Sequence, residues 1–257
     1  MDHRLHNLHT WVINLDRATQ RLARISAQLQ GLGIPWTRLA AVDARALTPE
    51  QRAALDEPAY RRKHGMTPSP GELGCYLSHV QVMRALLASR FEFALVLEDD
   101  VLLKPALPAV LEALVAHRGR WDVAKLSAVH SGTPQPYLPI TPQHQLNVML
   151  TRCTGASAYL VNRAAAQAYV DRLLPMSLPY DHAFDQGWRL GIRFRLVTPT
   201  PCDHDDRIET TIVIGPNRKF AWWRRLPCFA WRLGNELRRV RHGLGQTWKE
   251  RRFASRG

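Results

Sequence analysis

Three adjacent acids, Glu98, Asp99 and Asp100, are the residues of this 257-residue chain whose types and spacing point most directly to chemistry. They follow the apolar run 93–97, which is typical of a buried strand in an α/β sheet. Ligands of such sheets bind just beyond the carboxyl ends of the strands. Crowded carboxylates repel one another unless a cation lies among them, and hard oxygen ligands suit Mg²⁺ or Mn²⁺. The pattern predicts a metal site, with a solvated acidic turn as the alternative.

The start of the chain is predicted to fold as a strand, a helix and a second strand, at 11–15, 17–32 and 36–42. Asp16 is predicted to cap the helix. A nucleotide would lie where these strands end, although there is no GxGxxG motif to indicate a dinucleotide. The polar side chains at those ends are the candidate contacts, with a solvated helix face as the alternative for the two arginines: Asn14, Arg17, Arg21 and Asp43.

The segment 71–79 is predicted to open a helix that runs to about residue 90 and carries Ser78 and His79. Glycines at its start indicate close approach by another backbone or by a ligand. Later helices are predicted at 107–116 and 163–174, and later strands at 121–127, 154–161 and 192–197, with Lys125 near the end of the first. The Pro-rich segment 131–142 is predicted to be a loop and a candidate substrate lid.

Two further candidates lie in the last third of the body. Asp181 is predicted at or near the N-cap of a short helix, where it could serve as a base or act in capping alone. His204 lies in a polar loop at 198–206 and is a candidate to complete the metal sphere. Both are predicted to meet the acids at the end of the strand 93–97.

The net charge of +13 is unevenly distributed. Residues 216–257 hold twelve Lys/Arg against two acids, so this tail carries +10 and the first 215 residues carry +3. We therefore predict a catalytic domain at 1–215 and a basic tail at 216–257. Four cysteines without short spacings predict free buried thiols, and no secretory signal or membrane-spanning run is visible, which predicts a cytoplasmic protein.

The tail is predicted to form an amphipathic helix. Apolar residues recur every three or four positions from Leu226 to Trp248, with Pro227 at the start, and the arginines lie mostly off this stripe. An Arg-rich face opposite Leu and Trp is typical of an interfacial helix on anionic lipid. A platform for single-stranded nucleic acid is the alternative, but a continuous apolar stripe favours lipid or a partner helix. We predict peripheral attachment to the inner face of the cytoplasmic membrane.

Four ordered motifs together resemble glycosyltransferase family 25, to which bacterial lipooligosaccharide galactosyltransferases belong. They are Val-Ile-Asn-Leu-Asp-Arg at 12–17, Gly-Glu-Leu-Gly-Cys and Ser-His within 71–79, Leu-Glu-Asp-Asp at 97–100, and Pro-Tyr-Asp at 179–181. The resemblance covers most of residues 9–215. It implies an α/β nucleotide-sugar transferase fold of the A type, a Rossmann-like mixed sheet flanked by helices, to which the basic amphipathic tail is added.

The resemblance also implies a UDP-sugar donor, most often UDP-galactose, a divalent cation, and inversion at the anomeric carbon. Glu98 and Asp100 would then correspond to the acidic metal-binding motif, and Asp99 would face the donor sugar or its ribose. The motif here is Glu-Asp-Asp and has no aspartate at its first position. Inversion requires a carboxylate base, for which Asp181 is the first candidate and Asp185 the second.

In this interpretation Lys125, Arg17 or Arg21 would hold phosphate oxygens. The acceptor would be a lipid-linked saccharide of lipooligosaccharide or a related glycan. Two other classes remain as alternatives: a non-catalytic binder of anionic surfaces or nucleic acid, and a metal-dependent phosphohydrolase. The charge of only +3 on the body disfavours nucleic-acid binding.

Overall fold

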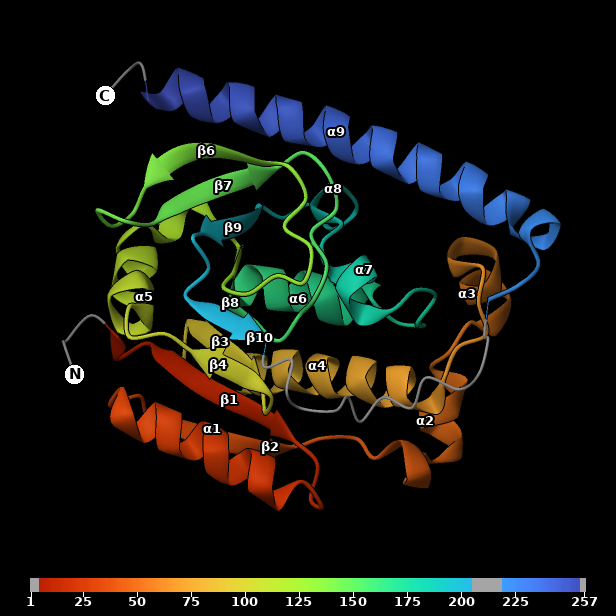
Figure 1. The fold of residues 1–257 in the computed structure, drawn as a ribbon, viewed down its shortest axis with the longest axis horizontal. Helices are drawn as coiled ribbons and strands as arrows, with labels where there is room; N and C mark the ends of the chain where they lie inside the picture. The colour runs from red at the N-terminus through yellow and green to blue at the C-terminus, as the bar shows by residue number, and fades with distance from the viewer. Residues whose placement is uncertain (1–4, 205–218, 255–257) are drawn as a thin grey trace.

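An eight-stranded mixed sheet with the strand order β2-β1-β3-β8-β5-β9-β7-β6 lies at the centre of the protein (Figure 1). The computed structural model describes residues 5–204 and 219–254. β1 is parallel to β2 and β3, β8 is antiparallel to β3 and β5, and β7 joins β9 to β6 by antiparallel pairing. The mixed α/β architecture predicted from the sequence is confirmed.

The strands of this sheet, in chain order, are β1 (Leu8–Asn14), β2 (Trp36–Ala40), β3 (Phe93–Glu98), β5 (Val123–Lys125), β6 (Pro134–Pro139), β7 (Gln145–Met149), β8 (Ala158–Asn162) and β9 (Phe194–Thr198). A second, two-stranded sheet pairs β4 (Val101–Leu103) with β10 (Cys202–His204). The helices are α1 (Thr19–Gly31), η2 (Ala44–Ala46), α2 (Pro49–Ala53), α3 (Glu57–His64), α4 (Pro70–Ala88), α5 (Leu107–Ala116), η3 (Arg118–Arg120), α6 (Arg163–Arg172), α7 (Tyr180–Phe184), α8 (Gly187–Leu190), η4 (Trp222–Arg225) and α9 (Leu226–Ala254).

Helices cover both faces of the sheet, because alternate side chains of each strand enter two separate cores. In β3, Ala94 and Val96 pack with α4, α6 and α7, whereas Phe93, Leu95 and Leu97 pack with α1 and α5. The same alternation holds in β1. A strand buried on both faces has to be apolar throughout, which is why the run 93–97 identifies the centre of the sheet.

Two local predictions were wrong. Asp16 does not cap α1: the helix begins after Ala18 without a side-chain cap, and Asp16 instead forms an ion pair with Arg38 of β2. The Pro-rich segment is not a loop or a lid, since Pro134–Pro139 forms β6 at the edge of the sheet. Proline lacks the N–H that an inner strand must donate, so an edge is where a strand with three prolines is tolerated.

The C-terminal helix begins at Leu226 with Pro227 in its first turn, as predicted, but it is not detached from the body. α9 lies over β6, β7 and α8 and meets α3 near its beginning (Figure 1). Arg239 of α9 binds the carboxylate of Asp185 through two nitrogens, at 2.6 and 3.0 Å, and both side chains are almost completely buried. Near the other end, Glu250 pairs with Arg195 at 2.9 Å.

These ion pairs attach the helix to the body through its polar side. The predicted boundary between residues 215 and 216 lies outside the described residues, and the division into domains stays a prediction. Within the described ranges, no helix combines the length and apolar character needed to cross a bilayer. The four cysteines are free thiols, as predicted.

We expect Arg239→Ala to lower the free energy of unfolding by about 3–5 kcal/mol, because it leaves the Asp185 carboxylate buried without its partner. Urea denaturation followed by circular dichroism measures the change. The neighbouring Arg238 is exposed, so Arg238→Ala serves as the control and should change stability by no more than about 0.5 kcal/mol. Equal unfolding midpoints for the two variants would contradict the assignment of this ion pair as the anchor of α9.

Candidate active site

Glu98 is the last residue of β3, and Asp99 and Asp100 follow it, at the side of the sheet where the parallel strands β1 and β2 also end. Ile13 of β1 lies opposite Glu98, so Asn14, the last residue of β1, faces the acids at the end of β3. Together they line a cleft with a volume of about 250 Å³. Nine of the predicted site residues lie in its wall: Asn14, Arg17, Arg21, Ser78, His79, Glu98, Asp99, Asp100 and His204.

Asp99 is held by two partners that the strand order brings to it. The Nδ2 of Asn14 donates to Asp99 Oδ2 at 2.6 Å, and Arg21 of α1 forms an ion pair with the other oxygen. Arg38 of β2 in turn donates to Asn14 Oδ1 at 3.0 Å. Asn14 thus orients Asp99: the residue is only 2% exposed, and its polar atoms form hydrogen bonds within the protein.

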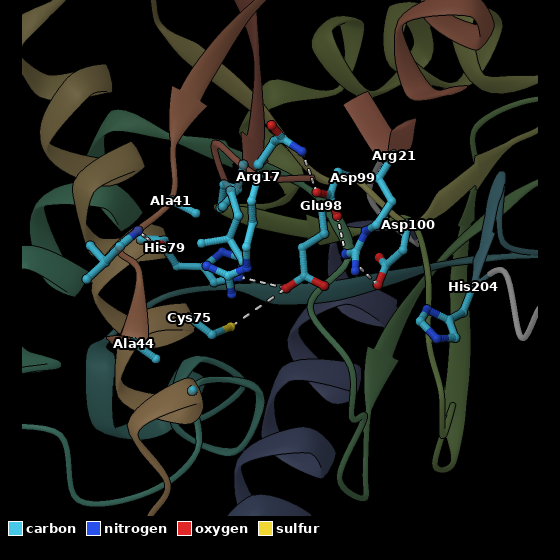
Figure 2. Close-up of a pocket in the computed structure, with 16 residues that line it drawn as sticks. Arg17, Arg21, Ala41, Ala44, Cys75, His79, Glu98, Asp99, Asp100 and His204 are labelled. Carbon is cyan, nitrogen blue, oxygen red and sulfur yellow. Dashed lines mark hydrogen bonds and ion pairs between the residues drawn. The ribbon is translucent and has the colours of Figure 1, made fainter. Parts of the chain in front are cut away.

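Asp100 is the least satisfied of the three acids. Its Oδ2 lies 3.4 Å from Arg21, an interaction that Figure 2 marks with a dashed line, while its Oδ1 is buried and has no hydrogen-bond partner among the described residues. Burial and the nearby charge of Glu98 raise the pKa of Asp100 to about 6. Within the described part of the chain, Asp100 Oδ1 thus lacks a partner, and the surroundings of the Asp100 carboxyl oppose its ionisation.

Glu98 is oriented by a buried aromatic cluster. His79 Nε2 donates to Glu98 Oε1 at 3.0 Å, the His79 ring stacks on Tyr180 with ring centroids 4.1 Å apart, and its Nδ1 lies 2.9 Å from the hydroxyl of Tyr159. Burial opposes the ionisation of Glu98, but the hydrogen bond from His79 and the charges of His79 and His204 together outweigh it and lower the pKa of the carboxyl. His79 was predicted to contact the donor; in the structure it also positions Glu98.

The loop after β2 closes the cleft against the start of α4. Ser78 accepts from the backbone N–H of Val42 at 2.9 Å, and a Cβ added to Gly74 would lie 2.6 Å from the Val42 carbonyl oxygen. The glycine is thus required by close approach of another backbone, one of the two reasons predicted for it. Asp43 follows in this loop; it accepts from Arg45 N at 2.9 Å and forms an ion pair with Arg17 at the mouth of the cleft.

Two residues that were predicted to lie in the site lie elsewhere, so both predictions were wrong. Lys125 is completely buried and donates to the carbonyl oxygens of Cys153 and Thr154, so its ammonium group cannot meet a phosphate. Asp185 is the buried partner of Arg239, and its carboxylate accepts from Cys153 N as well. Both charges are compensated inside the body rather than exposed to a ligand, which the sequence could not reveal because their partners are far away in the chain.

Asp181 is the second residue of α7, near its N-cap, and is not among the residues that line the cleft. Its Oδ2 accepts from Gly155 N at 3.1 Å. Burial, the charge of Glu98 and the charge of Asp181 raise the pKa of the Cys75 thiol in the cleft wall. Thr154, the residue before Gly155, borders a second, polar cavity of about 380 Å³, together with His130, Ser131, Gly132, Thr151, Arg152 and Glu236.

The carboxylates of Glu98 and Asp100 are hard oxygen donors of the kind that Mg²⁺ and Mn²⁺ take, and Asp100 Oδ1 has no hydrogen-bond partner among the described residues. The predicted ligand set is nevertheless incomplete. The pairing of β10 with β4 places His204 opposite Val101, within the cleft wall, yet the described residues whose ligand atoms lie within 4.8 Å of one another are Cys75, His79 and Glu98. Because burial keeps the Cys75 thiol protonated, this trio is a hydrogen-bonded group.

Sequence reasoning missed Arg38 and Tyr180. Arg38 is a charged residue in the middle of β2, which is the signal that could have identified it. Tyr180 stands between the predicted Pro179 and Asp181 and stacks on His79, a contact with no signal in the sequence. Arg152 was also not predicted, and it borders the second cavity.

We expect Asp100→Asn to stabilise the cation-free protein at pH 7 by about 2–3 kcal/mol, with little effect at pH 4. The pKa of Asp100 is raised to about 6 in the folded protein and is about 3.9 in an unfolded chain. Stability from the protonated group is therefore complete below about pH 4 and is lost as the pH rises through about 6. Urea denaturation in a chelating buffer at both pH values measures the effect.

Asp122→Asn is the matched control. Burial opposes the ionisation of Asp122, but hydrogen bonds from Arg193 and Asn162 outweigh it and lower the pKa, so this variant should lose stability at pH 7. If Asp100→Asn changed the free energy of unfolding equally at pH 4 and pH 7, the surroundings of the Asp100 carboxyl would not oppose its ionisation.

The chain was compared with known proteins. The family model for "Glycosyltransferase family 25 (LPS biosynthesis protein)" matches residues 7–184. The sequence is 28% identical to procollagen galactosyltransferase 1 of Danio rerio over 144 residues, which are 53% of this chain and 24% of that protein. It is 37% identical to procollagen galactosyltransferase 2 of Homo sapiens over 95 residues, 35% of this chain and 15% of that protein.

A third relative, the inactive glycosyltransferase 25 family member 3 of Mus musculus, is 32% identical over 124 residues, 45% of this chain and 21% of that protein. This chain thus matches less than a quarter of the length of each of these relatives. The family match, by contrast, covers more than half of this chain and includes β1, the start of α4, the acids after β3 and α7. The chain belongs to glycosyltransferase family 25.

Proposed function

We propose that the protein transfers a hexose from a UDP-sugar to a saccharide acceptor. Family membership supports glycosyl transfer, and the names of the zebrafish and human relatives support galactose as the sugar. The observation that carries the proposal is the cleft at the carboxyl end of β3, where Glu98 and Asp100 meet two arginines of the first strand–helix unit. A nucleotide diphosphate needs such a combination of cations and metal-binding carboxylates.

Arg17 and Arg21 are the residues proposed to hold the diphosphate. Both now pair with acids, Arg17 with Asp43 and Arg21 with Asp99, so a donor would exchange these partners for its phosphate oxygens. A bound Mn²⁺ or Mg²⁺, held by Glu98 and Asp100, would supply Lewis-acid stabilisation of the charge on the leaving UDP. Asn14 and His79 keep Asp99 and Glu98 in place for this role.

Asp181 is the proposed base for inversion. Its carboxylate would accept the proton of the acceptor hydroxyl, whose oxygen attacks the anomeric carbon while the bond from that carbon to UDP breaks. Two observations support this role: the carboxylate accepts from Gly155 N, next to Thr154 in the wall of the second cavity, and its charge acts on Cys75 in the wall of the donor cleft. The second cavity is the proposed place of the acceptor. The backbone N–H of Gly155 donates to this carboxylate at 3.1 Å and fixes its orientation.

The proposed acceptor is a lipid-linked saccharide of lipooligosaccharide or a related glycan, met at the inner face of the cytoplasmic membrane. Support comes from the family description, which refers to LPS biosynthesis, and from the concentration of positive charge in residues 216–257. The zebrafish and human relatives carry names that refer to procollagen instead.

Release of UDP from UDP-galactose tests the donor and the cation together. We expect turnover in Mn²⁺ or Mg²⁺, loss of turnover in a chelator, and a fall of at least about 10²-fold in Asp100→Asn. Asp203→Asn, at an exposed acid near the same edge, is the control and should behave as wild type. A protein that binds no UDP-sugar would support the non-catalytic alternative, and one that cleaves phosphate esters instead would be a phosphohydrolase.

We expect Asp181→Asn to reduce transfer by about 10²- to 10⁴-fold, because the acceptor hydroxyl loses its base. The amide oxygen of asparagine can still accept from Gly155 N, so the fold and the affinity for UDP should be retained. Calorimetric titration with UDP and a transfer assay on the same preparation separate the two effects. Transfer at the wild-type rate would exclude Asp181 as the base.

A further inference from the structure

The exposed apolar side chains of this protein are concentrated on one surface. In the described part of the chain, nine large hydrophobic side chains are exposed, and Val129 is the one that lies outside the C-terminal segment. The other eight form what we call the outer stripe of η4 and α9: Trp222, Trp223, Leu226, Phe229, Leu233, Leu237, Leu244 and Trp248. Soluble monomers rarely leave such a continuous patch exposed unless it binds something.

The helix is amphipathic with its apolar side outward. Leu226, Leu233, Leu237, Leu244 and Trp248 follow one another at intervals of seven and four residues, which keeps them on one side of a helix over about 33 Å. Leu233 and Leu237 are 64% and 63% exposed. Buried polar residues lie away from this stripe: Asn235, Arg239, Thr247 and Glu250. Of these, Arg239 and Glu250 attach α9 to the body through ion pairs.

The exposed charges beside the outer stripe are all positive. Six exposed cations lie on η4 and α9: Arg224, Arg238, Arg241, Lys249, Arg251 and Arg252. Of the two acids of α9, Glu250 is buried and pairs with Arg195 and Arg120, while Glu236 is partly exposed and pairs with Arg239 of the same helix. The surface therefore offers apolar side chains together with a net positive charge.

We propose that this outer stripe and its six cations form a docking surface for an anionic lipid bilayer, on which α9 lies parallel to the membrane. Leucines and tryptophans would enter the boundary between headgroups and acyl chains, and the arginines and Lys249 would reach the lipid phosphates. Trp222 and Trp223 at one end and Trp248 at the other suit this boundary, since indole combines an apolar ring with an N–H donor.

The same observations disfavour two other occupants. A second copy packed stripe to stripe would bring the two sets of cations together, while Glu250 is buried and the partly exposed Glu236 already pairs with Arg239. Nucleic acid would use the cations but not the leucines, which have no base-stacking surface. The proposal rests on the proposed function in one respect: a lipid-linked acceptor gives the protein its reason to dock. The docking itself requires no sugar transfer.

The geometry also separates docking from folding. Because the stripe points away from the body, its leucines can be replaced without opening a cavity, whereas deletion of the helix would leave Asp185 and Arg195 buried without partners. Substitution is therefore the informative test. We would use the full chain and three variants, each compared with wild type for its circular dichroism spectrum and thermal midpoint.

The apolar variant is Leu233→Gln/Leu237→Gln/Leu244→Gln, since glutamine keeps helix propensity. The charge variant is Arg238→Gln/Arg241→Gln/Lys249→Gln. Its matched control removes three exposed cations elsewhere, Arg84→Gln/Arg90→Gln/Arg118→Gln. Co-sedimentation is measured with vesicles of phosphatidylcholine alone and with vesicles that contain phosphatidylglycerol, at low and at physiological salt.

We expect wild type and the control to bind the phosphatidylglycerol vesicles and not the neutral ones. The charge variant should bind at least about tenfold more weakly, and the apolar variant should not sediment. The proposal fails if wild type does not bind, if the control weakens as much as the charge variant, or if the apolar variant binds like wild type. A dimer in solution that the leucine substitutions abolish, without vesicle binding, would assign the stripe to a second copy.

Release of UDP from UDP-galactose is measured on the same preparations without vesicles. Unchanged turnover with lost vesicle binding confirms that docking is separate from catalysis. Vesicle binding without any turnover would contradict the proposed function and leave the docking surface standing. Turnover without vesicle binding in wild type would support the proposed function and contradict the docking surface.

Discussion

The repulsion among three carboxylates at the end of β3 is the constraint on which the site depends. Each acid is held by a different neighbour: His79 orients Glu98, Asn14 and Arg21 hold Asp99, and Asp100 retains an oxygen without a partner among the described residues. These neighbours come from α4, β1 and α1, so the strand order of the sheet is what makes the cluster tolerable. The negative charge that these neighbours leave uncompensated is centred on Asp100, and a bound cation would neutralise it.

A second group of buried charges fixes the C-terminal helix. Asp185 and Arg195 belong to the body, and Arg239 and Glu250 of α9 are their partners. The ion pairs therefore attach the helix and at the same time compensate two buried charges of the body. The polar side of α9 is consumed by these contacts, which leaves the leucine and tryptophan side to solvent. Burying the polar side thus accounts for the unusual exposure of the apolar one.

Asp181 is linked to the region of α9 by one hydrogen bond. Its Oδ2 accepts from Gly155 N, and the preceding residue, Thr154, borders a polar cavity that Glu236 of α9 also borders. If the outer stripe lies on a bilayer, the same helix presents one side to the lipid and contributes from another to the wall of the proposed acceptor cavity. The carboxylate of Asp181 would meet both substrates without a large movement of the chain, because its position is fixed by a backbone N–H of another segment.

The sequence by itself determined the class of fold, the central strand with its acids, a close approach by a backbone or a ligand at the start of α4, the helical C-terminus and the motifs of the family. All of these depend on local periodicity or on residues adjacent in the chain, which a pattern can express. Only the tertiary structure decided that Lys125 and Asp185 are buried, that Pro134–Pro139 is an edge strand, and that the stripe of α9 faces outward. A helical pattern gives the same stripe whether it packs inward or outward, and the choice depended on Asp185 and Arg195, whose partners lie more than fifty residues away in the chain.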